Sequence, residues 1–343
     1  MLSGGEIPRV SLISIDGAIG PATAGYISRA TQVAAAAKSE CLIIQLDTPG
    51  GLLESTKAIV QAFYVSPVPV VVYVAPTGAN AGSAGCFIAL AADVAAMAPN
   101  TSIGAAHPVE FGGLGQAKSD DVMVKKLENF AASYIEAIAD KRHRNADWAK
   151  AAVRDSASIT SEKALDLKVI DLIARDLPDL LRQLDGRTIG ERVLQTARAE
   201  ITKIPMLARE RVFQMLWRPE VMFILMLVAI YGIVGELSNP GVILPGVAGG
   251  IALILVLYMG AALPINIAGI ALILLGLALF IADVFAPTHG VLTTGGIISF
   301  LLGSLLLFDG AGPAFRLPLA LIIPATIVTA LFFLFVFGEG RMK

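Results

Sequence analysis

Residues 70–85, VVVYVAPTGANAGSAG, carry a short apolar run directly into a turn of small residues around Ser83. The valine-rich run predicts a buried β-strand, and the small residues after it predict a tight turn into a helix. A strand, a turn and a helix in this order form the repeating unit of an α/β fold. The serine has two interpretations: it caps the helix, or it is a nucleophile whose developing charge the helix N-terminus stabilises.

The same unit recurs on both sides of this stretch, which predicts an α/β domain with parallel strands over residues 1–188. The predicted strands are residues 9–17, 41–47, 69–75, 93–99 and 101–106. The predicted helices are residues 22–38, residues 52–64, a segment from about Ser83, residues 121–142 and a helix with Ser161 as its N-cap.

The second half of the chain has a different composition. Of the 343 residues, 55% are hydrophobic and 16% charged, and the mean hydropathy of +0.72 is well above that of a soluble domain. Charged residues become scarce after Pro219, and five apolar segments near the roughly 20 residues of a bilayer span follow. They are residues 221–237, 241–262, 265–285, 290–308 and 318–338. We therefore predict an α-helical polytopic transmembrane domain of about five spans over residues 220–343.

Residues 189–219 are interpreted as a linker between the two domains. Its last part, MLARERVFQMLWRP (residues 206–219), is predicted to be an amphipathic helix that lies along a membrane surface or an ordinary linker helix.

Several functional classes are excluded by what the sequence lacks. The net charge of −2 provides no basic surface for nucleic acid. The chain has no HExxH, CxxC or GxxxxGK[ST] motif, so neither a zinc site nor an ATPase site is indicated, and we expect no metal or cofactor. The two cysteines, Cys41 and Cys86, lie in apolar surroundings that are typical of small packing residues. The chemistry must therefore come from ordinary side chains.

A catalytic serine needs donors for an oxyanion and a base. Gly50 and Gly51 follow a predicted strand in LDTPGG (residues 46–51), and unshielded backbone N–H groups at such a turn can form an oxyanion hole. His107, in GAAHPV, is one candidate base. The other two histidines are less suitable, because His143 lies in the charged run DKRHRN and His289 in the apolar half of the chain.

Lysine is the alternative base if burial lowers its pKa. On the helix after Asp121, Lys126 flanks a predicted buried stripe, whereas Lys125 points to the polar face. The stripe consists of Met123, Leu127, Phe130, Tyr134 and Ile138. Lys126 is thus interpreted either as an inward-facing base or as a side chain that keeps its amine in water.

Five segments in order resemble the NfeD family of membrane-bound serine proteases of the ClpP class, over essentially the whole chain. The segments are LDTPGG, ANAGSAG, PNTSIGAAHPV, EKALDLKVID and ELSNPGVILPGVAG. The resemblance implies a ClpP/crotonase-like α/β domain with repeated β-β-α units and a Ser–Lys dyad. It assigns Ser83 as the nucleophile and Lys126 as the base. In soluble ClpP the base is a histidine after a similar segment, so His107 stays an alternative base or a cleft residue.

The resemblance also assigns the oxyanion donors to the backbone N–H groups of Gly51 and Ala84, with Gly50 allowing the turn. It further implies cleavage of apolar polypeptide segments without ATP, in membrane quality control. The expected partner is a stomatin- or prohibitin-like (SPFH) membrane protein, and the expected assembly is a homo-oligomer. Long members of the family carry a C-terminal OB-fold domain, which we expect this chain to lack.

The family usually places its protease domain on the extracytoplasmic side of the cell (inner) membrane, and we expect the same here. The charges near the spans are divided: the arginines before the first span favour a cytoplasmic domain, whereas Arg341 and Lys343 favour the opposite orientation. Two other functions fit the pattern. One is a non-catalytic membrane scaffold that organises stomatin-type assemblies, and the other is a crotonase-like acyl-CoA enzyme, which rests on fold analogy alone.

Overall fold

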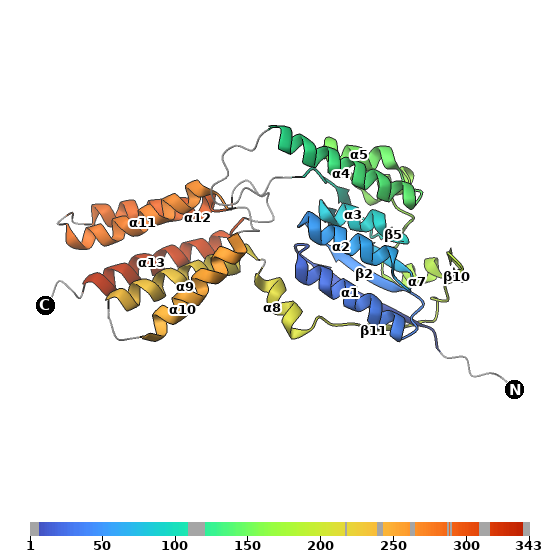
Figure 1. The fold of residues 1–343 in the computed structure, drawn as a ribbon, viewed down its shortest axis with the longest axis horizontal. Helices are drawn as coiled ribbons and strands as arrows, with labels where there is room; N and C mark the ends of the chain where they lie inside the picture. Colours follow the sequence, from blue (N-terminus) through green and yellow to red (C-terminus); the bar gives the residue numbers. More distant parts are fainter. Residues whose placement is uncertain are drawn as a thin grey trace. The chain divides into compact units, whose positions relative to one another are not determined.

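The computed structural model describes residues 7–108, 121–216, 218–238, 243–260, 265–286, 288, 290–308 and 316–338. The described residues form two compact units, an α/β unit up to Gln214 and a helical unit whose helices begin at Pro219. Figure 1 shows the two units joined through helix α8 (Ala208–Leu216). Each unit is described by itself below.

A six-stranded, fully parallel sheet forms the centre of the α/β unit, in the order β11-β1-β2-β3-β5-β8. Its strands are β1 (Arg9–Asp16), β2 (Leu42–Asp47), β3 (Val70–Val74), β5 (Val94–Met97), β8 (Leu172–Ile173) and β11 (Glu200–Lys203). The strand β3 is buried along its whole length because helices cover both faces of the sheet, as its unbroken valine run predicts. The edge strand β11 comes from the segment that we interpreted as a linker.

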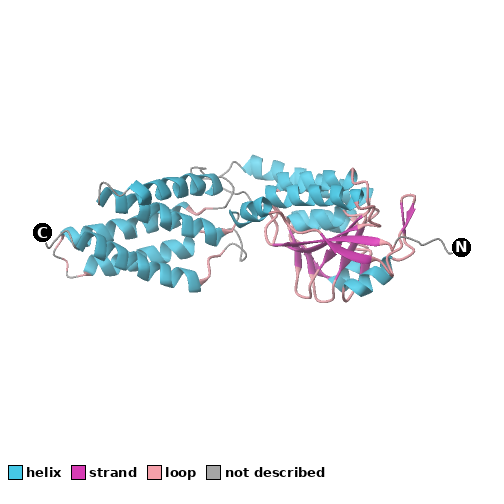
Figure 2. Cartoon of the chain, turned by 90° about the horizontal axis from the view of Figure 1, so that it is seen from below, coloured by secondary structure: helices cyan, strands magenta, loops and turns pink. Residues whose placement is uncertain are grey.

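Alternate residues of the strands pack into two separate cores. On one face, Ile44 and Val72 pack with the helices α1 (Pro21–Ala36), α2 (Leu53–Tyr64), α3 (Ala84–Ala91), α4 (Asp121–Lys141) and α5 (Ala146–Arg154). On the other face, Ile43 and Val71 pack with α7 (Leu177–Leu184). Figure 2 shows the strands gathered between these helices.

A second, three-stranded sheet follows the order β4-β6-β7 and lies where the main strands end. Its strands are β4 (Asn80–Gly82), β6 (Ser102–Gly104) and β7 (Ser158–Thr160). The chain therefore runs β3-β4-α3 and then β5-β6-α4, which are two consecutive β-β-α units. The predicted α/β architecture with repeated β-β-α units is confirmed, and Ser83 lies between the second strand and the helix of the first unit.

Smaller elements complete this unit. The hairpin of β9 (Thr188–Ile189) and β10 (Arg192–Val193) follows α7. The helix α6 (Ser161–Asp166) is present, but its predicted cap is wrong: Thr160 is at the N-cap position, and Ser161 is the first helical residue. The Ser161 hydroxyl is buried without a hydrogen-bond partner in the described part of the chain.

Five helices of the second unit coincide with the five predicted apolar segments. They are α9 (Pro219–Ser238), α10 (Ile243–Gly260), α11 (Ile267–Phe285), α12 (Val291–Leu306) and α13 (Leu319–Gly338). Among the described residues, α9 and α10 are long and apolar enough to cross a membrane, and the other three are apolar over shorter lengths. The helical domain is therefore as expected, while the count of five spans stays a prediction.

Glycines let the helices of this unit pack in close pairs. A side chain at Gly232 of α9 would meet the Pro245 carbonyl oxygen of α10 at 2.3 Å, and one at Gly269 of α11 would meet Leu307 Cα at 2.7 Å. Such backbone approach is the way in which helices associate where hydrophobic burial gives no driving force.

Candidate active site

Ser83 lies in a sharp turn between β4 and α3. Its backbone angles are φ 47° and ψ −111°, in a region that a residue with a side chain rarely adopts. Such strain costs about 1–3 kcal/mol and persists where the surrounding structure imposes it, commonly at functional sites. A serine on a strained turn from strand to helix is the geometry of a nucleophile elbow. Although Ser83 occupies the N-cap position of α3, its side chain makes no capping hydrogen bond, so the capping interpretation loses its main support.

Three hydrogen bonds connect the end of β2 to β4 and so bring LDTPGG beside this turn. The Asn80 N–H donates to Asp47 Oδ1 over 3.0 Å. The Thr48 N–H donates to the Asn80 carbonyl over 2.7 Å, and the Gly82 N–H donates to the Thr48 carbonyl over 3.0 Å. The two glycine-rich stretches, about thirty residues apart in the sequence, therefore form one site.

Gly50 lies directly against Ser83. A Cβ atom at Gly50 would be 2.6 Å from Ser83 Cβ and 3.1 Å from Ser83 Oγ, and the φ of Gly50 is +132°. Both the space and the backbone conformation therefore require glycine here. The structure thus brings Gly50 and Ser83 together as predicted.

The Gly51 and Ala84 amides are the predicted oxyanion donors; Gly51 follows Gly50, which lies against Ser83, and Ala84 follows Ser83 itself. The Ile19 N–H donates to the Gly50 carbonyl over 2.8 Å, and the Leu52 N–H donates to the Ile19 carbonyl over 2.9 Å. Between these two bonds, the Gly51 N–H has no acceptor among the described residues, and neither has the Ala84 N–H at the start of α3. Two unpaired amides beside a nucleophile are the donors that a tetrahedral intermediate needs.

The buried stripe predicted for the first half of α4 is wrong. Met123 is 53% exposed and Phe130 44% exposed, while Leu127 and Tyr134 are half-buried. The buried face of α4 lies farther along the helix, where small residues let it pack closely; it consists of Ala131, Ala132, Ile135, Ile138 and Ala139.

Lys126 is consequently exposed, as is Lys125. Neither the Lys126 ammonium nor the Ser83 hydroxyl makes a hydrogen bond within the described ranges. Of the two interpretations of Lys126, its exposure agrees with the side chain that keeps its amine in water, and its role as a base stays a proposal.

His107 is half-buried, and its ring orientation is fixed by one hydrogen bond. Its Nδ1 lies 2.8 Å from the Val153 carbonyl oxygen. Because a carbonyl only accepts, Nδ1 carries the proton, and Nε2 of the neutral ring keeps its lone pair. His107 follows β6, whose Gly104 carbonyl accepts the Ser83 N–H over 3.0 Å. The histidine makes no hydrogen bond to Ser83.

Cys86, three residues after Ser83, is fully buried, and burial raises the pKa of its thiol. A thiol held protonated in this way is not a competing nucleophile.

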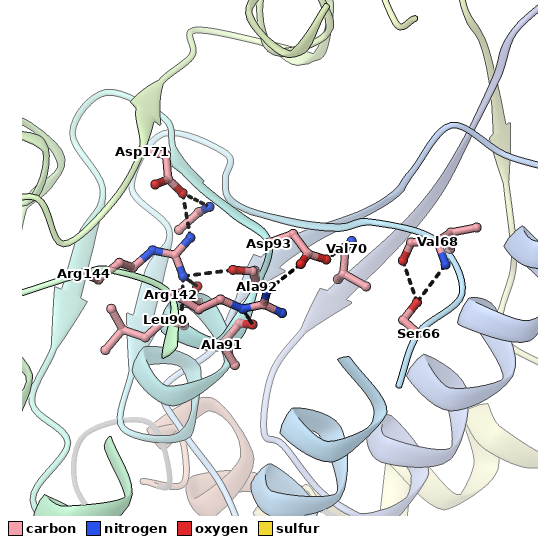
Figure 3. A network of polar contacts seen from close by, with 12 residues as sticks. Ser66, Val68, Val70, Leu90, Ala91, Ala92, Asp93, Arg142, Arg144 and Asp171 are labelled. Atoms are coloured by element: carbon pink, nitrogen blue, oxygen red, sulfur yellow. Dashed lines mark hydrogen bonds and ion pairs between the residues drawn. The ribbon is translucent and has the colours of Figure 1, made fainter. Parts of the chain in front are cut away.

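Two arginines that we did not single out from the sequence cap the other end of α3 (Figure 3). The Arg144 side chain is only 2% exposed and donates to the Leu90 and Ala92 carbonyls over 2.5 and 2.9 Å and to Asp171 over 2.6 Å. Arg142 donates to the Ala91 carbonyl over 2.8 Å and to Asp93 over 2.6 Å. Positive charge at a helix C-terminus satisfies its free carbonyls and complements its dipole. The helix that begins at Ser83 is thus fixed at its far end.

The comparisons with known proteins point to one family. Residues 9–187 match the N-terminal domain of NfeD1b, and residues 220–338 match the NfeD integral membrane domain. Over 309 residues the chain is 34% identical to the membrane-bound protease PH1510 of Pyrococcus horikoshii, covering 88% of this chain and 69% of that protein. Over 353 residues it is 30% identical to the membrane protein NfeD1b of Bacillus subtilis, covering 98% and 75% respectively.

Two solved structures of the Pyrococcus horikoshii stomatin-specific protease 1510-N superpose on the α/β unit. One is a lysine-to-alanine mutant in complex with a substrate peptide, with a TM-score of 0.56 and 31% identity over 61% of this chain and 97% of that chain. The other is a serine-to-alanine mutant, with a TM-score of 0.54 and 33% identity over 58% of this chain and 99% of that chain.

Proposed function

The chain belongs to the NfeD family and is a membrane-bound peptidase, and from this premise we propose that it cleaves a stomatin-like membrane protein with Ser83 as nucleophile and Lys126 as general base. The observation that carries the proposal is the strained Ser83 turn packed against Gly50, with the unpaired Gly51 and Ala84 amides beside it.

The proposed reaction is acyl transfer in two steps. The neutral amine of Lys126 accepts the Ser83 hydroxyl proton while Ser83 Oγ attacks the scissile carbonyl carbon, and the Gly51 and Ala84 amides stabilise the oxyanion. The C–N bond then breaks, and the lysine returns the proton to the leaving amine. In the second step a water molecule gives a proton to Lys126 and attacks the acyl-enzyme. The bond between Ser83 Oγ and the acyl carbon then breaks, the acid leaves, and Lys126 returns the proton to Ser83 Oγ. No nucleotide takes part.

Two observations support Lys126 as the base. In 1510-N the mutated lysine and the mutated serine are separated by about as many residues as Lys126 and Ser83 are here. In the present structure, Lys126 lies one turn before Phe130, whose ring stacks on Tyr134, and Tyr134 stacks in turn on Phe87 of α3, each at 6.0 Å between ring centroids. Phe87 lies one turn after Ser83, so the row of side chains from Lys126 through Phe130 to Tyr134 ends in contact with the nucleophile's helix.

The substrate is proposed to be an apolar segment of the stomatin-like partner. Val122, Met123 and Phe130 leave 56%, 53% and 44% of their surfaces exposed around Lys126. An apolar segment that covers these side chains would also exclude water from the Lys126 amine, which favours its neutral form. In the proposed homo-oligomer, a second copy of the chain would also bury part of this apolar surface around Lys126.

Replacing each candidate base by alanine tests the dyad. General-base catalysis contributes typically 10²–10⁴-fold, so we expect Lys126→Ala to lower kcat for a fluorogenic apolar peptide by about 10³-fold. Lys125→Ala is the matched control, because Lys125 is also exposed and lies at the neighbouring position of α4. We expect this variant to keep a kcat near the wild-type value. Initial rates of the full-length protein in detergent measure both. A larger loss in His107→Ala than in Lys126→Ala would transfer the role of base to His107.

We also propose that the chain is a five-span protein of the cell membrane with its peptidase domain on the extracytoplasmic side. A membrane-impermeant thiol reagent applied to intact cells tests the orientation with a cysteine in place of Glu54, whose side chain is 84% exposed. The natural cysteines, Cys41 and Cys86, are buried and give little background. We expect labelling of E54C in intact cells; labelling only after lysis would show a cytoplasmic domain.

A further inference from the structure

Helix α8, which precedes the first apolar helix, turns polar side chains toward the α/β unit. Glu210 is 8% exposed and accepts Arg29 Nε and Nη2 over 2.7 and 2.8 Å in a bidentate pair. Val212 and Phe213, in contrast, leave 57% and 52% of their surfaces exposed. This is the reverse of an amphipathic helix packed through its apolar face, so specific polar contacts fix α8 in place.

Gln214 lies one turn after Glu210 and has both ends of its amide engaged. Its Nε2 donates to the Ala18 carbonyl over 2.9 Å, and its Oε1 accepts the Thr23 hydroxyl over 2.8 Å. Thr23 is fully buried in α1. Gln214 therefore ties α8 to the loop between β1 and α1.

The loop that Gln214 holds also holds the Gly50–Gly51 turn. Ile19, the residue after Ala18, donates its N–H to the Gly50 carbonyl over 2.8 Å and accepts the Leu52 N–H over 2.9 Å. The contact is close, because a Cβ at Gly51 would lie 2.1 Å from the Ile19 carbonyl oxygen. A displacement of Ala18 and Ile19 thus moves the Gly51 amide.

We propose that Gln214 is a positioning residue of the peptidase site: by fixing the Ala18 carbonyl it sets the position of the Gly51 amide relative to Ser83. The inference rests on the proposed function of Gly51 as an oxyanion donor. The apolar helix α9 begins at Pro219, shortly after Gln214. The hydrogen bond from Gln214 to Ala18 therefore also lets the position of α8 affect the rate of peptide cleavage.

The test is the steady-state kinetics of Gln214→Leu in the full-length protein, with a soluble fluorogenic peptide. An oxyanion donor acts mainly in the transition state, so its displacement lowers kcat and leaves KM nearly unchanged. Complete loss of such a donor costs about 10²–10³-fold, and we expect a misplaced one to cost about 10-fold in kcat. Gln214→Glu keeps an acceptor for Thr23 but cannot donate to Ala18, so it should show the same loss.

Gln183→Leu is the matched control. Gln183 also donates from a helix to a backbone carbonyl, that of Ile173 over 2.9 Å, but it lies on α7 and has no connection to Gly51. We expect wild-type kcat from this variant. An unchanged kcat in both Gln214 variants, a change in KM alone, or an equal loss in Gln183→Leu would overturn the inference while leaving the proposed function intact. An inactive wild-type protein would instead overturn the proposed function and the inference with it.

Discussion

Replacing Ser83 by alanine is expected to lower kcat/KM for peptide hydrolysis by at least about 10⁴-fold, because the reaction then loses its nucleophile while binding and the oxyanion donors remain. No neighbouring side chain can take over, since Cys86 is buried and burial raises its pKa. The fold should be unaffected, because the Ser83 hydroxyl makes no hydrogen bond within the described ranges. Thermal unfolding of the variant should therefore match that of the wild type.

Covalent labelling with a fluorophosphonate identifies the nucleophile independently of the substrate. We expect the wild-type protein to be labelled once, at Ser83, and Ser83→Ala to remain unlabelled. Ser102→Ala is the control, because Ser102 lies on the adjacent strand β6 and uses its hydroxyl to donate to Asn80 Oδ1 over 3.1 Å. Equal labelling of Ser83→Ala and wild type would refute the assignment. A protein that neither labels nor hydrolyses peptide, yet still assembles with its partner, would point to a scaffold.

The parts of the site that the sequence predicted are those fixed by short-range constraints. A valine run that enters a turn of glycines and alanines can form little other than a strand and a close backbone turn. Both LDTPGG and GANAGSAG have this property, and the structure places Gly50 against Ser83.

The wrong predictions are those in which the spacing of apolar residues was used to predict which side chains are buried. On α4, apolar spacing correctly indicates a helix, but a stripe is buried only where another element covers it. The aromatic side chain of Phe130 stays partly exposed, whereas Ala131 and Ile135 pack in the core. The inward-facing interpretation of Lys126 depended on this stripe, and the side chain is exposed instead.

Polar side chains that make buried contacts were not predicted from the sequence. The charged run DKRHRN gave no indication of burial, yet Arg144 is buried beneath the C-terminus of α3. Helix α8 was interpreted as an amphipathic helix on a membrane surface or as a linker helix, and neither interpretation predicts the contacts that Glu210 and Gln214 make with the α/β unit. Both cases depend on carbonyls and charges from distant parts of the chain, such as Leu90 for Arg144, and no local spacing identifies them.

Replacing Arg144 by alanine is expected to lower the free energy of unfolding of the α/β unit by about 3–5 kcal/mol, the cost typical of removing one partner from a buried ion pair. Alanine leaves the Leu90 and Ala92 carbonyls without their donor and Asp171 without its cation. Urea unfolding of the full-length protein in detergent, followed by the fluorescence of buried Trp148 in a Trp217→Phe background, measures the change.

The control for Arg144 is Arg175→Ala. Arg175 is 78% exposed at its side chain and pairs with Asp179, four residues later, and ion pairs at the surface contribute about 0–1 kcal/mol. A similar loss in the two variants would show that Arg144 contributes no more than a surface ion pair. Arg144→Lys sharpens the test, since lysine keeps the charge but lacks the planar fork that reaches carbonyls and carboxylate together. We therefore expect its stability to lie between those of Arg144→Ala and the wild type, because anchoring the C-terminus of α3 requires the guanidinium geometry as well as the charge.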